Sequence, residues 1–301
     1  MHNPVMILGS LYGTYWLVLT LSAVLLRKPT LFTAHLRANC LIAGAIIMMM
    51  PLYWMLVTSL KDSGEAMAYP PTWWPRQPRW SNYSEAWNAP EVGFGRYYWV
   101  SLYTTFLVTA GSIFTSLLAG YAFARMEFRG KSILFLLILA TLMVPGQVLI
   151  IPDYIILARL QWLDTYRALT VPWFASVFSI FLIRQFMLSL PAELWDAAQI
   201  DGASRWMFLW RIAVPLILPA IITIGIFNFI STWNSLLWPL VVTSRPEMRT
   251  LMVGLQVFTT EAGGEINLLM AASTFCILPV FAGFFLLQRF FIEGIAKSGI
   301  R

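Results

Sequence analysis

The segment WDAAQIDGASRWMFLWRIAVPLILP, Trp195 to Pro219, places acidic and basic residues between two long apolar runs. Pro191 suits a first helical position, Glu193 would lie in the first turn, and Gly202 can end the helix. Ser204 can then cap a second helix that leads into the next apolar run. Each run is long enough to cross a bilayer, since a spanning helix needs about 20 mostly apolar residues. The segment therefore predicts two short helices that meet at a glycine outside the membrane.

The chain as a whole is far more apolar than a soluble protein. Of its 301 residues 59% are hydrophobic and 11% are charged, and the mean hydropathy is +0.71, whereas a soluble domain carries about 25% charged residues. This composition predicts a membrane protein. In such a protein the net charge of +6 indicates basic loops on one side of the membrane rather than a nucleic-acid partner.

Motifs for chemistry are missing from the sequence. The two histidines and two cysteines form no metal-binding pattern, and no phosphate-binding loop or nucleophile motif occurs. An intramembrane enzyme, one alternative function, would need ionisable or metal-binding residues at membrane depth. We therefore expect no catalytic residue, no metal site and no cofactor in this chain.

Apolar runs predict seven spanning helices in an all-α bundle. The first run lacks the basic start of a signal peptide and is long for its apolar core, so we expect it to be a retained span. Prolines in or beside several runs predict kinks or hinges. The seven predicted spans are Val5–Leu26, Leu41–Leu60, Trp99–Phe123, Ile133–Ile151, Ala168–Leu188, Val214–Val242 and Leu268–Leu287.

Charge predicts the orientation of these spans. One side holds 12 of the 20 basic and five of the 14 acidic residues, which gives that side +7 and the other −1. Because short loops rich in Lys and Arg stay in the cytoplasm, the opening segment and the C-terminus are predicted to be cytoplasmic. The segments assigned to this side are 27–40, 124–132, 184–212 and 288–301.

The charged segment resembles the EAA loop of permease subunits of ABC importers. That motif reads E-A-A, three residues, G, nine residues, I-x-L-P. Here Asp196-Ala197-Ala198 is followed at the same spacing by Gly202 and by Ile212-Ala213-Val214-Pro215, with Asp and Val replacing Glu and Leu. FLIRQFMLSLPAELWDAAQIDGAS, WNSLLWPLVV and LLQRFFIEGIAKSG look like the second permease subunit of maltose and glycerol-3-phosphate importers, and the similarity covers about residues 40–301.

The resemblance implies a domain organisation and a set of contact residues. Residues 41–301 would form the six-span permease domain of a type I ABC importer, and residues 1–40 an extra N-terminal span with a cytoplasmic linker. The loop at 189–213 would form the coupling helix that docks in a groove of the ATP-hydrolysing subunit. The expected loop residues are Glu193, Asp196, Ala197, Ala198, Asp201, Gly202, Ala203 and Pro215.

The same resemblance implies the partners and the location. The chain would sit in the bacterial cytoplasmic (inner) membrane among lipid, with a second permease subunit, two ATPase subunits and an extracytoplasmic substrate-binding protein. ATP and Mg would be held by the ATPase subunits, so this chain would not hydrolyse ATP itself. Closure of the ATPases would rock the spans between inward-facing and outward-facing states, provided that each partner prefers one state.

Polar uncharged residues gather in FNFISTWNSLLWPL, within the sixth predicted span. At about 100° per residue, one helix face would carry Asn228, Ser231, Asn234, Ser235 and Trp238. Amides, hydroxyls and an indole suit a neutral polyhydroxylated cargo, so these residues are predicted to line a pathway for a sugar or related polyol. The alternatives are hydrogen bonding between spans, glycerol-3-phosphate or another small polar solute as cargo, and a membrane scaffold that transports nothing.

The stretch YPPTWWPRQPRWSNYSEAW follows the second predicted span on the external side. Its aromatic content argues against disorder. We expect either an ordered cap, a docking surface for the binding protein, or a plain connection.

Overall fold

The computed structural model describes residues 29–89, 93–260 and 265–298, and this part of the chain contains helices and no strand. The first predicted span, Val5–Leu26, lies outside the described residues. By its contacts the chain divides into two compact units, Met1–Val57 and Thr58–Arg301. The predicted boundary at residue 40, between the extra span with its linker and the permease domain, stays a prediction.

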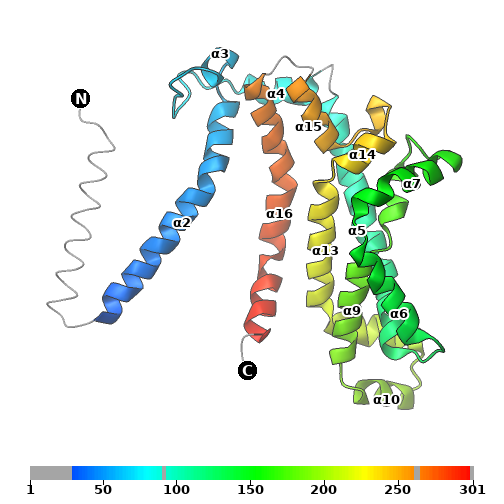
Figure 1. Cartoon of the computed structure of the whole chain (residues 1–301). Coiled ribbons are helices and arrows are strands. Elements are labelled where there is room, and N and C mark those ends of the chain that lie inside the picture. Colours follow the sequence, from blue (N-terminus) through cyan, green and yellow to red (C-terminus); the bar gives the residue numbers. More distant parts are fainter. Residues whose placement is uncertain (1–28, 90–92, 261–264, 299–301) are drawn as a thin grey trace. The chain divides into compact units, whose positions relative to one another are not determined.

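The described helices are numbered in chain order (Figure 1). They are α2 (Pro29–Ser59), α3 (Ser63–Ala66), α4 (Ser81–Asn88), α5 (Phe94–Arg125), α6 (Lys131–Ala140), η1 (Thr141–Met143), α7 (Gly146–Arg159), α8 (Tyr166–Thr170), η2 (Val171–Trp173), α9 (Val177–Ser189), α10 (Glu193–Ile200), α11 (Arg205–Met207), the π-helix η3 (Phe208–Ala213), α12 (Val214–Leu216), α13 (Leu218–Trp233), α14 (Leu237–Val242), η4 (Pro246–Met248), α15 (Leu251–Thr260) and α16 (Ile266–Ser298).

Four stretches of the described chain are long and apolar enough to cross a membrane, and two bent helix pairs raise the number to as many as six. The four contain most of the predicted spans that begin at residues 41, 99, 168 and 268. The longest of these four stretches is α5. It has 32 residues and is about 48 Å long at 1.5 Å per residue, which is more than a bilayer core requires. The four stretches are Leu36–Ser59, Phe94–Arg125, Tyr166–Ser189 and Ile266–Leu286.

The predicted span over Ile133–Ile151 is not one straight helix, and whether the bent pair crosses the membrane as a single span stays a prediction. The chain bends by 102° between Lys131–Met143 and Gly146–Arg159. Pro145 stands at the bend, and Val144 before it is extended, with φ −84° and ψ 117°. A residue that precedes proline is disfavoured in the α conformation, so the helix ends there although the sequence stays apolar.

The predicted span Val214–Val242 is likewise divided, here into several shorter helices. The helical stretch Arg205–Leu216 meets α13 at 80°, and the bend lies at Ile217, where Pro219 follows within two residues. Helix α13 then ends at Trp233, and α14 begins only at Leu237. Polar residues that would share a face of one helix are therefore divided between two helices and the turn between them.

Helix α5 forms the centre of the second unit, with α9, α13 and α15 packed against it. Two glycines allow a close approach. A Cβ atom added at Gly120 would lie 2.5 Å from Cγ2 of Ile183, and one at Gly111 would lie 2.5 Å from the ring of Phe174. Small residues at such crossings let membrane helices pack backbone to backbone, which fixes α9 against α5.

The aromatic segment after α2 is ordered and forms a cap. This was one of the three alternatives that the sequence left open. The side-chain amide of Asn82 donates to the carbonyls of Ser59 at 2.8 Å and Lys61 at 2.7 Å. Helix α4 packs on α16 through Trp87 and Phe275, whose ring centroids are 5.1 Å apart. Within this unit, the cap and α10 lie at opposite ends of the bundle (Figure 1). A docking role for the cap stays a prediction.

Candidate coupling loop and polar cavity

Helix α10 is a short, well-terminated helix between α9 and α11. It begins at Glu193, two residues after the predicted start at Pro191. Gly202 has φ +74°, its N–H donates to Gln199 O at 3.0 Å, and the N–H of Ala203 donates to Ala198 O at 2.8 Å. These two bonds form a Schellman motif, which needs a left-handed residue that glycine supplies cheaply. The prediction that glycine ends this helix is confirmed.

The second short helix begins where the sequence predicts. Ser204 Oγ accepts a hydrogen bond from the N–H of Met207 at 3.2 Å and so caps α11. The chain continues through the π-helix η3 into the bend before α13. Helical irregularities of this kind gather at functional sites, and here one lies between α10 and the spanning helix α13.

One face of α10 is anchored to the bundle. Ala198 is buried, and Leu194 and Trp195 pack against the same apolar cluster. The ring of Trp195 meets the ring of buried Phe208 edge-on at 5.0 Å. That cluster also contains residues of α5, α9 and α13. A displacement of α10 therefore acts directly on three elements of the bundle.

A basic side chain fixes the chain where it enters this loop. Nη2 of Arg125, in the last turn of α5, donates to Met187 O at 2.9 Å and also to Leu190 O. Arg184 Nε donates in the other direction, to Phe123 O at 3.2 Å. Cations at helix C-termini satisfy free carbonyls and favour the helix dipole. The cytoplasmic ends predicted for α5 and α9 are thereby joined.

The opposite face of α10 is open. The exposed residues predicted for the contact are Glu193, Asp196, Ala197, Asp201 and Gly202. A Cβ atom at Gly202 would meet nothing within 4 Å, so the backbone is accessible there. Of the other predicted loop residues, Ala198 and Ala203 face the cluster. Pro215 lies on α12 beside the bend and not on α10.

Sequence reasoning missed the apolar part of this open face. Ile200 is 87% exposed, and Trp206 is 59% exposed. Our interpretation of the segment concentrated on its charges and small residues. The helical period could have indicated Ile200, because this position falls about 160° from the buried Ala198.

The predicted pathway residues lie in different environments, and their role in a pathway stays a prediction. Asn228 Nδ2 donates to Ser112 Oγ at 3.0 Å and to Ser179 Oγ at 3.3 Å, so this amide joins α13 to α5 and α9. Such bonds hold membrane helices together, which was the alternative considered for this stretch. Asn234 is exposed, and its Nδ2 donates to Ile230 O at 2.9 Å at the end of α13.

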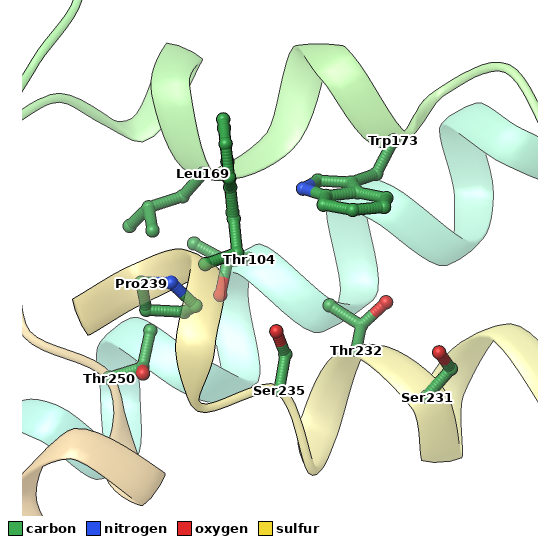
Figure 2. A pocket seen from close by; sticks show the side chains of 9 residues that line it. Thr104, Leu169, Trp173, Ser231, Thr232, Ser235, Pro239 and Thr250 are labelled. Carbon is green, nitrogen blue, oxygen red and sulfur yellow. The ribbon is translucent and has the colours of Figure 1, made fainter. Parts of the chain in front are cut away.

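The other three predicted residues meet at a small cavity. Ser231, Ser235 and Trp238 line a partly enclosed space of about 100 Å³ between α5, α8, η2 and the turn from α13 to α14 (Figure 2). Trp238 is buried, and its Nε1 donates to Ala168 O at 3.0 Å. The lining residues that sequence reasoning missed are Thr104, Leu169, Trp173, Thr232, Pro239 and Thr250.

Possible metal ligands do not gather in the part of the chain that the structure describes. Among residues 29–89, 93–260 and 265–298, no group of three or more His, Cys, Asp or Glu side chains is placed to hold a metal ion. The open face of α10 and the cavity contain the predicted residues and are the candidate sites considered below.

Comparison with known proteins identifies the family. Residues 111–297, more than half of the chain, match the model of the family described as binding-protein-dependent transport system inner membrane component. The sn-glycerol-3-phosphate transport system permease protein UgpE of Yersinia enterocolitica is 35% identical over 264 residues, which are 86% of this chain and 94% of that protein. The arabinooligosaccharides transport system permease protein AraQ of Bacillus subtilis is 31% identical over 259 residues, 85% of this chain and 92% of that one.

A solved structure supports the same fold. A chain from the crystal structure of a bacterial ABC transporter involved in the import of the acidic polysaccharide alginate superposes with a TM-score of 0.78 at 22% identity, over 88% of this chain and 98% of that chain. The multi-pass helical fold, the family match and the curated relatives agree. This chain is a transport permease of the membrane, and it belongs to the family of binding-protein-dependent transport system inner membrane components.

Proposed function

We propose that this permease forms half of the pathway of a bacterial ABC importer for a sugar or related polyol. We also propose that it couples to an ATP-hydrolysing subunit through the open face of α10. The observation that carries the coupling is Ile200, a large apolar side chain that is 87% exposed beside charged residues. Ile200 lies outside the predicted spans, on the same segment as exposed Trp206, so a protein partner that covers this face would bury apolar surface there.

The anchoring of α10 supports its role as a lever. Its inner face belongs to the cluster shared by α5, α9 and α13, and its end is fixed by the Schellman motif at Gly202. A partner that binds one conformation of the loop more tightly than another shifts the whole bundle toward that conformation. The contact residues proposed are Glu193, Asp196, Ala197, Ile200 and Gly202.

The relatives support a polyhydroxylated cargo. Their names cite sn-glycerol-3-phosphate and arabinooligosaccharides, which share a dense set of hydroxyl groups. The nine residues that line the cavity are uncharged and include two serines, three threonines and two tryptophans. These side chains favour a neutral sugar. The 35% identity to UgpE favours glycerol-3-phosphate as the second candidate cargo.

The proposal includes the partners of the assembly. They are a second permease subunit, two ATPase subunits that hold ATP and Mg, and an extracytoplasmic binding protein, while this chain itself catalyses nothing. One solved relative of 13% identity and TM-score 0.58 is described in complex with an alginate pentasaccharide-bound periplasmic protein. Helix α16 runs from the α4 end of its unit toward the α10 end (Figure 1), which supports a cytoplasmic C-terminus if α10 is cytoplasmic.

Charge reversal tests the coupling. We expect Asp196→Lys to abolish co-purification of the ATPase and substrate-stimulated ATP hydrolysis in liposomes, because Asp196 lies on the open face of α10. Glu127→Lys, an exposed acidic residue of the loop between α5 and α6, is the matched control and is expected to retain both. Uptake that survives Asp196→Lys unchanged would contradict the proposal. A loop that binds the ATPase while no solute crosses would favour the membrane scaffold.

A further inference from the structure

We propose that the cavity between α5, η2 and the turn from α13 to α14 is a subsite for the hydroxyl-rich edge of one neutral sugar unit. This inference rests on the proposed sugar transport and deepens it. The site differs from the stripe that the sequence predicts, because Asn228 and Asn234 have other partners. Residues of α5 and η2 take part, as does Thr250, which directly precedes α15.

A buried hydroxyl without a partner points to a ligand. Thr250 is 6% exposed, and its Oγ1 has no hydrogen-bond partner among the described residues. A buried polar atom left unpaired carries a desolvation penalty that a bound polar group would remove. The residue is one of those that line the cavity (Figure 2). The cavity therefore lacks a partner for this hydroxyl, and a ligand hydroxyl can supply it.

The wall of the cavity offers a donor and an acceptor together. Thr104 Oγ1 donates its proton to the backbone carbonyl of Val100 at 2.8 Å, which leaves its oxygen as an acceptor toward the cavity. Thr250 Oγ1 is free to donate. A sugar hydroxyl is at once donor and acceptor, so it can accept a hydrogen bond from Thr250 or donate one to Thr104.

Two indoles complete the wall. The ring centroids of Trp173 and Trp238 are 5.7 Å apart, and the rings are nearly perpendicular at 83°. The bond from Trp238 Nε1 to Ala168 O holds that ring in place. Trp173 is exposed at the mouth of the cavity, where its face is available to the apolar C–H side of a sugar ring. Rigid aromatic rings supply contact area at low entropic cost.

Size and charge define the class of ligand. The volume of about 100 Å³ lies below the roughly 300–1,000 Å³ of sites that enclose a drug-sized ligand. It therefore accepts an edge of one ring and not an oligosaccharide. None of the nine lining residues is charged, so a phosphate would lose its hydration without gaining a counter-charge. The geometry favours a neutral polyol over a phosphorylated one.

Cysteine protection tests the subsite in the assembled importer. The native thiols Cys40 and Cys276 are first replaced by Ser and Ala, and Ser235→Cys is introduced into the full chain. The complete complex in nanodiscs is labelled with a small uncharged water-soluble thiol reagent. We expect glycerol or L-arabinose to slow labelling at this position about threefold when its concentration is about twice that needed for half-protection, because the slowing depends on the occupied fraction of the site. Ser189→Cys, exposed at the end of α9, is the control and should label at an unchanged rate.

A second variant tests the unpaired hydroxyl. Thr250→Val keeps the shape and removes the donor, so we expect half-protection by L-arabinose to need about threefold to tenfold more sugar. The subsite is wrong if Ser235→Cys does not react, if neither neutral probe protects it, or if sn-glycerol-3-phosphate protects it as well as L-arabinose. The donor role is wrong if Thr250→Val leaves protection unchanged. If the protection experiment fails but Asp196→Lys abolishes coupling as expected, the subsite is wrong and the proposed importer function is still supported.

Discussion

Ile200 provides the sharpest test of the α10 surface, because its side chain contributes little to the fold of this chain. It is 87% exposed, so Ile200→Ala removes almost no packing within the permease. Full burial of an isoleucine side chain is worth about 1.5–3 kcal/mol. If the ATPase covers this residue, the substitution should weaken ATPase binding about 10-fold to 150-fold, at about 1.4 kcal/mol per factor of ten.

The measurement is the affinity of the detached ATPase for the permease complex in nanodiscs, together with substrate-stimulated ATP hydrolysis. Met143→Ala is the matched control, since Met143 is 85% exposed but lies at the bend between η1 and α7. We expect the control to bind the ATPase normally, and both variants to keep the melting temperature of the parent. The reasoning is refuted if Ile200→Ala binds the ATPase as tightly as the parent does.

Three further predictions concern the fold around the two sites. Gly202→Val should uncouple transport from ATP hydrolysis more than Gly202→Asn, because φ is +74° at this position. A residue strained in the left-handed region costs about 1–3 kcal/mol, and Asn costs less there. The number of solute molecules taken up per ATP hydrolysed measures the uncoupling. Gly120→Ala should lower stability by about 1–3 kcal/mol through overpacking, whereas Gly146→Ala meets open space and should not; thermal unfolding in detergent distinguishes them, and equal melting temperatures would contradict the contact. Asn228→Leu should lower the stability by about 0.6–1.7 kcal/mol, because its hydrogen bonds between helices are lost. Asn234→Leu, at an exposed cap, should lower the stability less. A lower melting temperature for Asn234→Leu than for Asn228→Leu would contradict the proposed role of Asn228.

Local signals made the helix α10 and its glycine-ended loop predictable from the residues of this segment. The glycine, the serine cap and the alternation of small and charged residues act over a few positions, and the structure has them in the expected places, with φ +74° at Gly202 and a capping bond from Ser204. The cavity was not predictable in this way. Thr104 and Thr250 are 146 positions apart in the chain, and hydroxyl residues in apolar runs are equally consistent with bonds between helices.

By itself the sequence determined that this protein crosses the membrane, where most of its helices lie, and which segment stands between them as a capped, glycine-ended loop. These properties follow from apolar length and from hydrogen bonds between near neighbours in the chain. Prolines at positions 145 and 219 indicated kinks, but only the tertiary structure decided that the chain turns there by 102° and 80°. Only the structure decided, too, that Asn228 joins three helices and that the buried hydroxyl of Thr250, a residue lining the cavity, has no partner among the described residues. The angle of a bend and the partner of a polar group depend on which helices pack together, and hydropathy carries no information about that choice.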